Sequence, residues 1–281
     1  MNKVVDLSEN NGNINLQELV DNGITGVILR ICWLGNHNNH TKDKQVENYY
    51  RQAKNLGLDI GFYVYSYCET QDALKSGLQY IDMLLEDLNI PTGTSIFLDL
   101  EDPQIEHLST TELTNQAEYF CNYMILRGYK AGIYANKYWF ENKLNIDKLC
   151  SYIIWLAEWE VSKPTVNFKY DIWQYTDELY INNKRFDANA SYYDFGNSNI
   201  ENNGNKNEGE FEMKLYQNGT TPEIVYQDVN CTKQIGYLHP HEQASCYGII
   251  ENKALIVYNI DGTNNLKSGF VKWLGGVNND T

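Results

Sequence analysis

Two acidic residues separated by a single leucine are the strongest indication of chemistry in this chain. Asp99 and Glu101 lie in the apolar stretch SIFLDLE, residues 95–101. Residues two apart in a strand point to the same face of a sheet, and an unpaired charge buried in a core is costly. We therefore interpret the pair as catalytic. The alternative is turn chemistry with Asp99 as a cap, because Asp102-Pro103 follows directly.

Two further aspartates occupy comparable places. Asp6 ends the first apolar segment, in VVDLSENNG, and Asp187 ends the last, in KRFDANAS. The carboxyl ends of barrel strands meet at one rim, so we expect both residues beside Asp99 and Glu101. Each aspartate alone is more often a helix cap. Four carboxylates could also bind a divalent cation, but there is no EF-hand-like loop and no histidine pattern, so we predict no metal and no other cofactor.

Aromatic residues accumulate near the same strand ends. Sugar rings combine apolar faces with hydroxyl rims, so a glycan-binding cleft needs aromatic platforms beside hydrogen-bonding groups. Aromatic residues in strands are ordinarily part of the core. Those aligned with the carboxylates are our candidate substrate contacts: Tyr63, Tyr65, Tyr134, Trp155 and Trp173.

The segments that must position these residues alternate between short apolar runs and helical patterns. Helical patterns cover 15–22, 43–57, 70–89 and 110–127, with Thr70 and Thr110 as candidate N-caps. This alternation predicts parallel βαβ units and an irregular (β/α)8-like barrel, in which loops replace some late outer helices. The eight expected strands are 3–7, 26–31, 59–67, 94–101, 130–135, 152–157, 170–176 and 184–188.

The pattern changes after the barrel. Residues 197–212 are polar, acidic and almost free of aliphatic side chains, which is typical of a linker. From Met213 the chain consists of short β-like runs separated by turns. We therefore expect a catalytic domain over 1–196 and a small all-β domain over 213–281 that is marginal alone and a candidate for self-association.

Composition excludes several classes of protein. With 42% hydrophobic residues among 281, the chain can bury a core and is not a disordered protein. A net charge of −15 without a Lys/Arg run excludes a nucleic-acid or anionic-membrane surface. Asp6 falls where a signal peptide needs apolar residues, so we expect synthesis in the cytoplasm without an export signal. The six cysteines form no CxxC pair and are expected to be free, mostly buried thiols.

An ordered set of motifs resembles the family 25 glycoside hydrolases, lysozymes of the muramidase type that are common among phage endolysins. The motifs cover nearly all of residues 1–190 and are VVDLSENNG, GFYVYSY, IFLDLED, GYKAGIYAN, WLAEW, DIWQYT and FDAN. The resemblance implies an irregular (β/α) barrel. It also implies cleavage of the β-1,4 bond between N-acetylmuramic acid and N-acetylglucosamine in peptidoglycan.

The resemblance also implies roles for individual residues. Glu101 would be the general acid, and Asp99 would stabilise the developing cation or orient the substrate acetamido group. Asp6 and Asp187 would be supporting carboxylates. Tyr63 would contact substrate, although Val64 stands where many members carry a histidine. Same-face residues on a strand are about 6.6 Å apart, between the separations of retaining and inverting enzymes, so spacing alone leaves the stereochemistry open; the resemblance favours retention.

The C-terminal segments EIVYQDVNCTKQIGYL, SCYGII and GFVKW resemble SH3-like cell-wall-binding domains of clostridial phage endolysins. This resemblance implies peptidoglycan and associated wall polymers as partners. Residues 213–281 carry 5 basic and 6 acidic side chains, which favours recognition by shape and aromatic contact. The candidate contacts, each with a core position as the alternative, are Tyr237, Tyr247, Tyr258 and Trp273.

Met213 is a candidate internal translation start. Glu208-Gly209-Glu210 can be encoded by a purine run that resembles a ribosome-binding site, a short spacer upstream. Some resembling endolysins produce their wall-binding module separately from such a start. Our hypothesis is a 213–281 fragment that assembles with the full-length chain; the alternative is a methionine that falls at the domain border by chance.

The favoured function is an endolysin that waits in the host cytoplasm and reaches the wall at lysis through a holin. Three alternatives remain from the sequence. They are a bacterial autolysin of the same chemistry, a barrel glycosidase acting on another wall glycan, and a catalytically dead wall-binding protein. The complete carboxylate set speaks against the last of these.

Overall fold

The computed structural model describes residues 2–35, 39–195, 214–227, 231–250, 253–259 and 266–272. The chain divides into two compact units, residues 1–202 and 203–281. Each unit has its own sheet and its own core. The expected linker 197–212 and Met213 lie outside the described residues.

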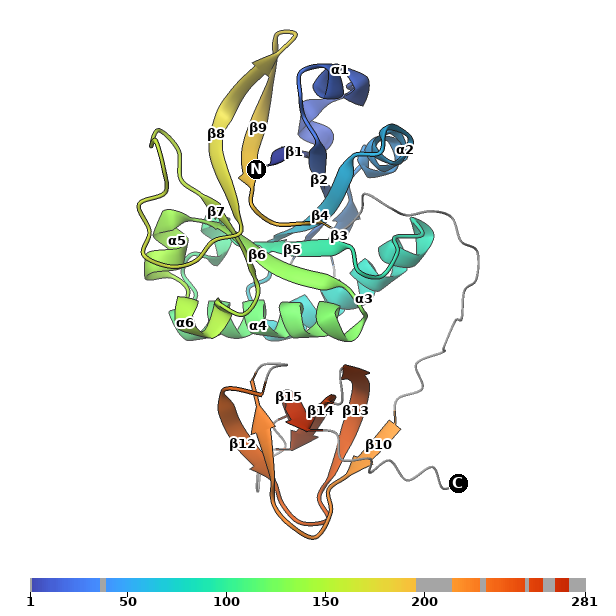
Figure 1. Ribbon diagram of the computed structural model, residues 1–281, viewed down its shortest axis with the longest axis vertical. Helices are drawn as coiled ribbons and strands as arrows, with labels where there is room; N and C mark the ends of the chain where they lie inside the picture. The colour runs from blue at the N-terminus through green and yellow to red at the C-terminus, as the bar shows by residue number, and fades with distance from the viewer. Residues whose placement is uncertain are drawn as a thin grey trace. The chain divides into compact units, whose positions relative to one another are not determined.

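The first unit is a closed barrel of eight strands, as predicted (Figure 1). β1 pairs with both β2 and β9, which closes the ring, and the short strand β3 extends it beside β2. The strands from β1 through β2, β4, β5, β6 and β7 to β8 are parallel neighbours. Their bounds are β1 Asn2–Leu7, β2 Gly26–Leu34, β3 His40–Lys42, β4 Asp59–Ser66, β5 Ser95–Asp99, β6 Lys130–Asn136, β7 Ile153–Ala157, β8 Ile172–Ile181 and β9 Lys184–Ser191.

The expectation of parallel strands throughout is wrong for β9. β9 runs antiparallel to both β8 and β1. Only Asn182 and Asn183 separate β8 from β9, and both have positive φ, at 49° and 61°. Two such residues form a tight hairpin turn, whereas a parallel crossover needs a dozen or more residues. The resulting β8–β9 hairpin extends beyond the barrel (Figure 1).

The four predicted helical segments correspond to α1, α2, α3 and α4, with one cap displaced, whereas the short helices α5 and α6 were not predicted. Thr70 caps α3 as expected, its Oγ1 accepting a hydrogen bond from the Ala73 amide at 3.1 Å. Ser109, not Thr110, caps α4, because Ser109 and Glu112 form a reciprocal capping box. The helices are η1 Glu9–Asn11, α1 Leu16–Asp21, α2 Val46–Leu56, α3 Gln71–Asp87, η3 Pro103–Ile105, α4 Thr110–Leu126, α5 Lys137–Asn142 and α6 Ile146–Leu149.

Strand alternation separates two cores. Side chains on the outer face of the strands pack with the helices, while inward side chains form a smaller, largely aromatic cluster. Gly132 makes room for this cluster, since a Cβ there would lie 2.7 Å from the Phe97 ring. The inner cluster closes the barrel below the carboxyl ends of the strands and contains Val4, Ile28, Tyr63, Phe97, Tyr134, Trp155, Ala157, Ile172 and Phe195.

The second unit is an antiparallel sheet of six strands in the order β10-β13-β14-β15-β11-β12. Its buried cluster includes Tyr216, Val225, Leu238, Ile256 and Val271. The described part of this unit is therefore all-β. Its strands are β10 Lys214–Gln217, β11 Glu223–Tyr226, β12 Gln234–Leu238, β13 Gln243–Ile250, β14 Lys253–Asn259 and β15 Leu266–Lys272.

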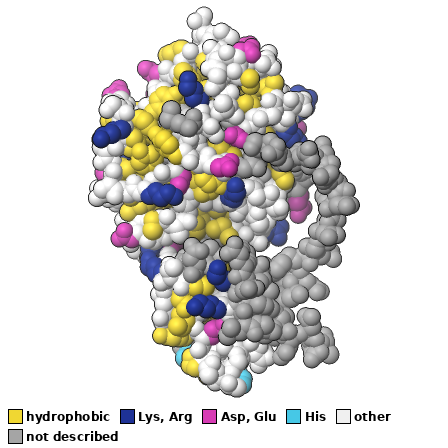
Figure 2. Space-filling model, in the orientation of Figure 1, with side chains coloured by type: hydrophobic (Ala, Val, Ile, Leu, Met, Phe, Trp, Pro, Cys, Tyr) yellow, Lys and Arg dark blue, Asp and Glu magenta, His cyan; other side chains and the backbone are white. Residues whose placement is uncertain are grey.

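On the face of the first unit drawn in Figure 2, hydrophobic side chains form several patches with acidic and basic groups interspersed between them. Among the described residues, no helix combines the length and apolar character needed to cross a membrane. Four of the six cysteines are buried, Cys150 is exposed, and Cys231 is partly exposed.

Candidate active site

The Asp99–Glu101 pair lies at the carboxyl end of β5. Asp99 is the last residue of the strand and shares the inward face with Phe97, which belongs to the inner cluster. Its side chain is buried, and its Oδ1 has no hydrogen-bond partner in the described structure. Burial raises the pKa of Asp99 well above its usual value, and the neighbouring charges of Glu101 and Asp6 raise it further.

Asp6 and Asp187 face each other across β1 and β9, which pair in register at these two residues. Asp6 is buried, and burial followed by the charge of Asp187 raises its pKa well above the usual value. Burial also raises the pKa of Asp187, to about 6. The structure thus brings all four predicted carboxylates into one electrostatically linked group, because the charges of Glu101 and Asp187 act on Asp6, and that of Asp187 acts on Glu101.

The position of Asp187 within its strand differs from the sequence prediction. It lies in the first half of β9, not at the end of a parallel strand. Because β9 is antiparallel to β1, the first half of β9 lies beside the last residues of β1. The convergence of Asp6 and Asp187 is therefore due to the hairpin that reverses the chain direction.

Two amide side chains that the sequence reading missed hold this group together. Gln174 Nε2 and Asn189 Nδ2 both donate to Asp6 Oδ2, at 3.0 and 2.8 Å. Gln174 Oε1 accepts hydrogen bonds from the Tyr134 hydroxyl at 3.0 Å and from Trp159 Nε1 at 3.1 Å. The sequence feature that could have indicated Gln174 is its place in the motif DIWQYT, where a polar side chain occupies a buried position on the inward face of a strand.

The candidate aromatic residues differ in their burial and in the groups that they contact. Trp155 is 2% exposed and donates from Nε1 to Asn189 Oδ1 at 2.7 Å, so it supports the site from within the barrel. Tyr63 is also buried and packs edge-on against Trp155. Tyr65 donates to Asp102 Oδ2 at 2.9 Å, and Asp102 directly follows Glu101 in the chain. Trp173 instead donates from Nε1 to the backbone carbonyl of Glu158.

A pocket of about 460 Å³ opens beside Glu101. Tyr134 lines it from β6, and two exposed aromatic residues outside the five candidates, Tyr138 and Trp159, form part of its wall. This volume is large enough for sugar-sized ligands. The remaining lining residues are Asn136, Lys137, Glu141, Asn142 and Ala157.

Comparison with known families agrees with the barrel fold. The model of the glycosyl hydrolases family 25 matches residues 5–184. The chain belongs to this family. The match begins within β1, at Val5, and runs through β8 to the first residue of β9. It therefore includes Asp6, Asp99 and Glu101, while Asp187 lies just beyond it.

Individual relatives of this family 25 chain are distant. The autolytic lysozyme of Clostridium acetobutylicum is 23% identical over 180 residues, which are 64% of this chain and 52% of that protein. The match thus spans about half the length of the curated relative. Several solved structures have the same fold. The modular autolysin LytC from Streptococcus pneumoniae, in complex with a synthetic peptidoglycan ligand, matches with a TM-score of 0.57 and 22% identity, over 67% of this chain and 46% of that one. The CTP1L endolysin matches with a TM-score of 0.56 and 23% identity, over 68% of this chain and 66% of that one.

In this family 25 barrel, the environment of Glu101 suits a carboxyl group that holds a proton. Burial raises its pKa, and a hydrogen bond with the Tyr134 hydroxyl opposes that rise. The Tyr134 hydroxyl has one proton to donate, either to Gln174 Oε1 at 3.0 Å or to the Glu101 carboxylate, and only the second bond lowers the pKa of Glu101. Within the described part of the chain, no group of three or more His, Cys, Asp or Glu side chains is placed to hold a metal ion.

The candidate wall contacts lie in the second unit. Tyr237 is 50% exposed on β12, which leaves its ring available for contact. Tyr258 is 5% exposed and packs in the core of the sheet, the alternative stated for it above. The side chains of Tyr247 and Trp273 lie outside the described residues.

Proposed function

We propose that this chain is a lysozyme that hydrolyses the β-1,4 bond between N-acetylmuramic acid and N-acetylglucosamine in peptidoglycan. The observation that carries the proposal is the group of four carboxylates at the rim of a family 25 barrel. Support also comes from the autolytic lysozyme relative and from the peptidoglycan ligand bound to the similarly folded LytC.

In the proposed reaction Glu101 protonates the leaving glycosidic oxygen. The oxocarbenium-like centre then needs a negative charge beside it. Asp99 supplies that charge, or orients the substrate acetamido group for attack with retention of configuration. Asp6 and Asp187 support the site from β1 and β9, and the pocket beside Glu101 receives a sugar against Tyr138 or Trp159.

Digestion of purified Gram-positive walls, preferably clostridial, tests this proposal. Wild-type protein should release new reducing ends on N-acetylmuramic acid. Glu101→Gln should abolish the release while wall binding persists, and Glu178→Gln, an exposed glutamate on β8, should behave as wild type. New amino or N-acetylglucosamine ends, or an active Glu101→Gln variant, would contradict it.

We infer that residues 213–281, which lie within the second unit, are an SH3-like wall-binding domain joined to a catalytic domain, 1–196, by the linker 197–212. Its all-β sheet, its near-neutral charge and the exposed Tyr237 support this. Binding of Glu101→Gln protein to washed walls measures it. Tyr237→Ala should weaken that binding, with Tyr180→Ala, another exposed tyrosine in the first unit, as the matched control.

We propose an endolysin role, in which the enzyme reaches the wall at host lysis, with an autolysin of the same chemistry as the second candidate. The CTP1L endolysin is described as regulated by a secondary translation product. That description supports an internal start at Met213 here, giving a 213–281 fragment that assembles with the full chain. Met213→Leu should remove the small band from expression gels; a band that persists would indicate proteolysis.

A further inference from the structure

Arg30 is a buried cation inside the barrel. On β2, Val27, Leu29 and Ile31 belong to the outer core, whereas Ile28 belongs to the inner cluster. By alternation Arg30 points inward with Ile28. It is 8% exposed and pairs in register with Tyr63, another inner residue.

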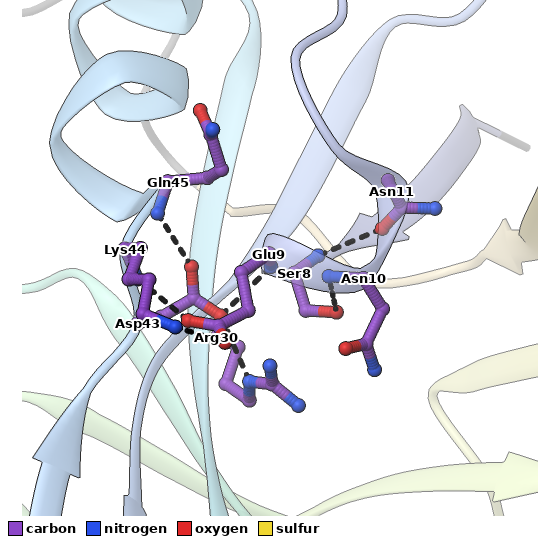
Figure 3. A network of polar contacts seen from close by, with 8 residues as sticks. All are labelled: Ser8, Glu9, Asn10, Asn11, Arg30, Asp43, Lys44 and Gln45. Carbon is purple, nitrogen blue, oxygen red and sulfur yellow. Dashed lines mark hydrogen bonds and ion pairs between the residues drawn. The ribbon is translucent and has the colours of Figure 1, made fainter.

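One end of the Arg30 side chain is clamped (Figure 3). Its Nε donates to Asp43 Oδ2 at 2.9 Å, and Asp43 is 1% exposed. Asp43 is itself fixed by the backbone amides of Glu9 and Gln45, at 2.9 and 2.8 Å. The guanidinium carbon lies 4.7 Å from the centre of the Trp33 ring.

At the other end of the guanidinium, Arg30 Nη2 is buried and has no hydrogen-bond partner among the described residues. A buried charged donor without a partner is expensive, so its retention calls for a reason beyond folding. The barrel interior that it enters is the one shared by Asp6 and Asp99, which continue the inward faces of Val4 and Phe97.

We propose that Arg30 is a positioning residue of the active site: anchored by Asp43, its guanidinium supplies the fixed positive charge that holds Asp99 as an anion while Glu101 keeps its proton. The proposal rests on the lysozyme function proposed above. The proposal gives Asp99 and Glu101 different partners. The charge of Arg30 acts on Asp99, whereas the group that opposes burial at Glu101 is the neutral Tyr134 hydroxyl.

The other groups around Asp99 cannot take this role. Its carboxyl neighbours Asp6, Glu101 and Asp102 raise its pKa. The charge of Asp99 contributes to the raised pKa values of four tyrosines, which therefore stay neutral near pH 7. They are Tyr63, Tyr65 and Tyr67 from the β4 side and Tyr134 from β6. Arg30 lowers the pKa of Asp99 and stays charged throughout the working range.

The negative groups that face Arg30 do not remove the effect of its charge on Asp99. Asp43 is paired through Nε alone, so it holds the guanidinium in place. Glu9 senses the Arg30 charge too, but its principal partner is Lys44, whose backbone amide donates to Glu9 Oε2 at 2.9 Å. The clamp therefore fixes the cation, while Nη2 stays buried without a hydrogen-bond partner among the described residues.

The test compares pH profiles of wall hydrolysis for full-length wild type, Arg30→Met and Arg30→Lys. Asp99 must be ionised for turnover, so loss of the cation raises its pKa and moves the acid limb of kcat/KM upward, by about one pH unit. Arg30→Lys should return the limb to its wild-type position. Arg51→Met, an exposed arginine on α2, is the matched control and should leave the limb in place.

Three outcomes overturn the proposal. They are an unmoved acid limb in a folded Arg30→Met variant, a limb that Lys does not restore, and a higher KM without a pH shift, which would make Arg30 a substrate ligand. Because Arg30→Met can fail to fold, wild-type protein with ¹³C-labelled Asp and Glu carboxyls provides a second measurement. Asp99 should titrate below Glu101, and the reverse order overturns the proposal. Wild-type protein that leaves walls intact would refute the lysozyme function instead, a result distinct from these.

Discussion

At the scale of single residues, burial gives the four carboxylates their properties. Asp6, Asp99, Glu101 and Asp187 all have raised pKa values, and burial is the largest cause for each. A site of this kind favours protonated carboxyls, so a positive charge or amide donors must stabilise the group that remains ionised. The barrel provides both, as Arg30 near Asp99 and as Gln174 and Asn189 on Asp6.

We predict that Asp187→Asn stabilises the protein at neutral pH while lowering activity. The folded pKa of Asp187, about 6, is above the unfolded value near 3.9. Its contribution to stability is therefore fully present below pH ~3.9 and is lost as pH rises through about 6. Asn removes this loss, and after discounting for partial exposure the gain at pH 7.5 should be about 1–2 kcal/mol.

Urea unfolding at pH 4 and pH 7.5 measures this effect. The two proteins should differ little at the lower pH, and the variant should be more stable at the higher one. Asp147→Asn is a suitable control, as a change of the same type in α6 at a distance from the four carboxylates along the chain. A variant that is less stable than wild type at pH 7.5 would contradict the prediction.

At the scale of elements, one hairpin supplies much of the site. β8 carries Gln174, and β9 carries Asp187 and Asn189. The Asn182-Asn183 turn sets the direction of β9 and so places Asp187 opposite Asp6. The site therefore depends on the closure of the barrel between its first and last strands, where β9 meets β1.

We predict that Gln174→Met, which keeps side-chain volume but removes three hydrogen bonds, lowers both stability and turnover. The bonds join Gln174 to Asp6, Tyr134 and Trp159. Leaving buried partners unsatisfied should reduce the free energy of unfolding by about 1–3 kcal/mol. Turnover should fall because both Asp6 and the Tyr134 hydroxyl beside Glu101 lose a fixed partner.

Urea denaturation and wall-digestion rates measure the two effects. Gln79→Met, an exposed glutamine on α3, should change neither. Unchanged turnover in a destabilised Gln174→Met protein would mean that the amide serves the fold alone.

At the scale of the whole molecule, sequence predicted the barrel and the four carboxylates but not the bonds between them. Acidic residues at the ends of apolar strands are visible in sequence, because their cost in a core demands an explanation. Gln174, Asn189 and Arg30 are not, since their roles depend on which strands become neighbours when the barrel closes. The direction of β9 could not be predicted, because the expected strands 170–176 and 184–188 are seven residues apart, whereas β8 continues to Ile181 and leaves a two-residue turn.

The two-unit organisation leads to the last prediction, which concerns a fragment ending at residue 202. All four carboxylates, the pocket beside Glu101 and the closed barrel lie within the first unit. The fragment should therefore fold and hydrolyse soluble glycan fragments with the kcat/KM of the full chain. On intact walls, a tethered binding unit raises the effective concentration of the enzyme at its substrate, so the fragment should be at least about tenfold slower at low enzyme concentration. The difference should shrink as enzyme concentration rises, because saturation replaces tethering. Equal rates on walls at every concentration would remove the wall-binding role from the second unit, and a fragment inactive on soluble glycan would place part of the catalytic requirement there.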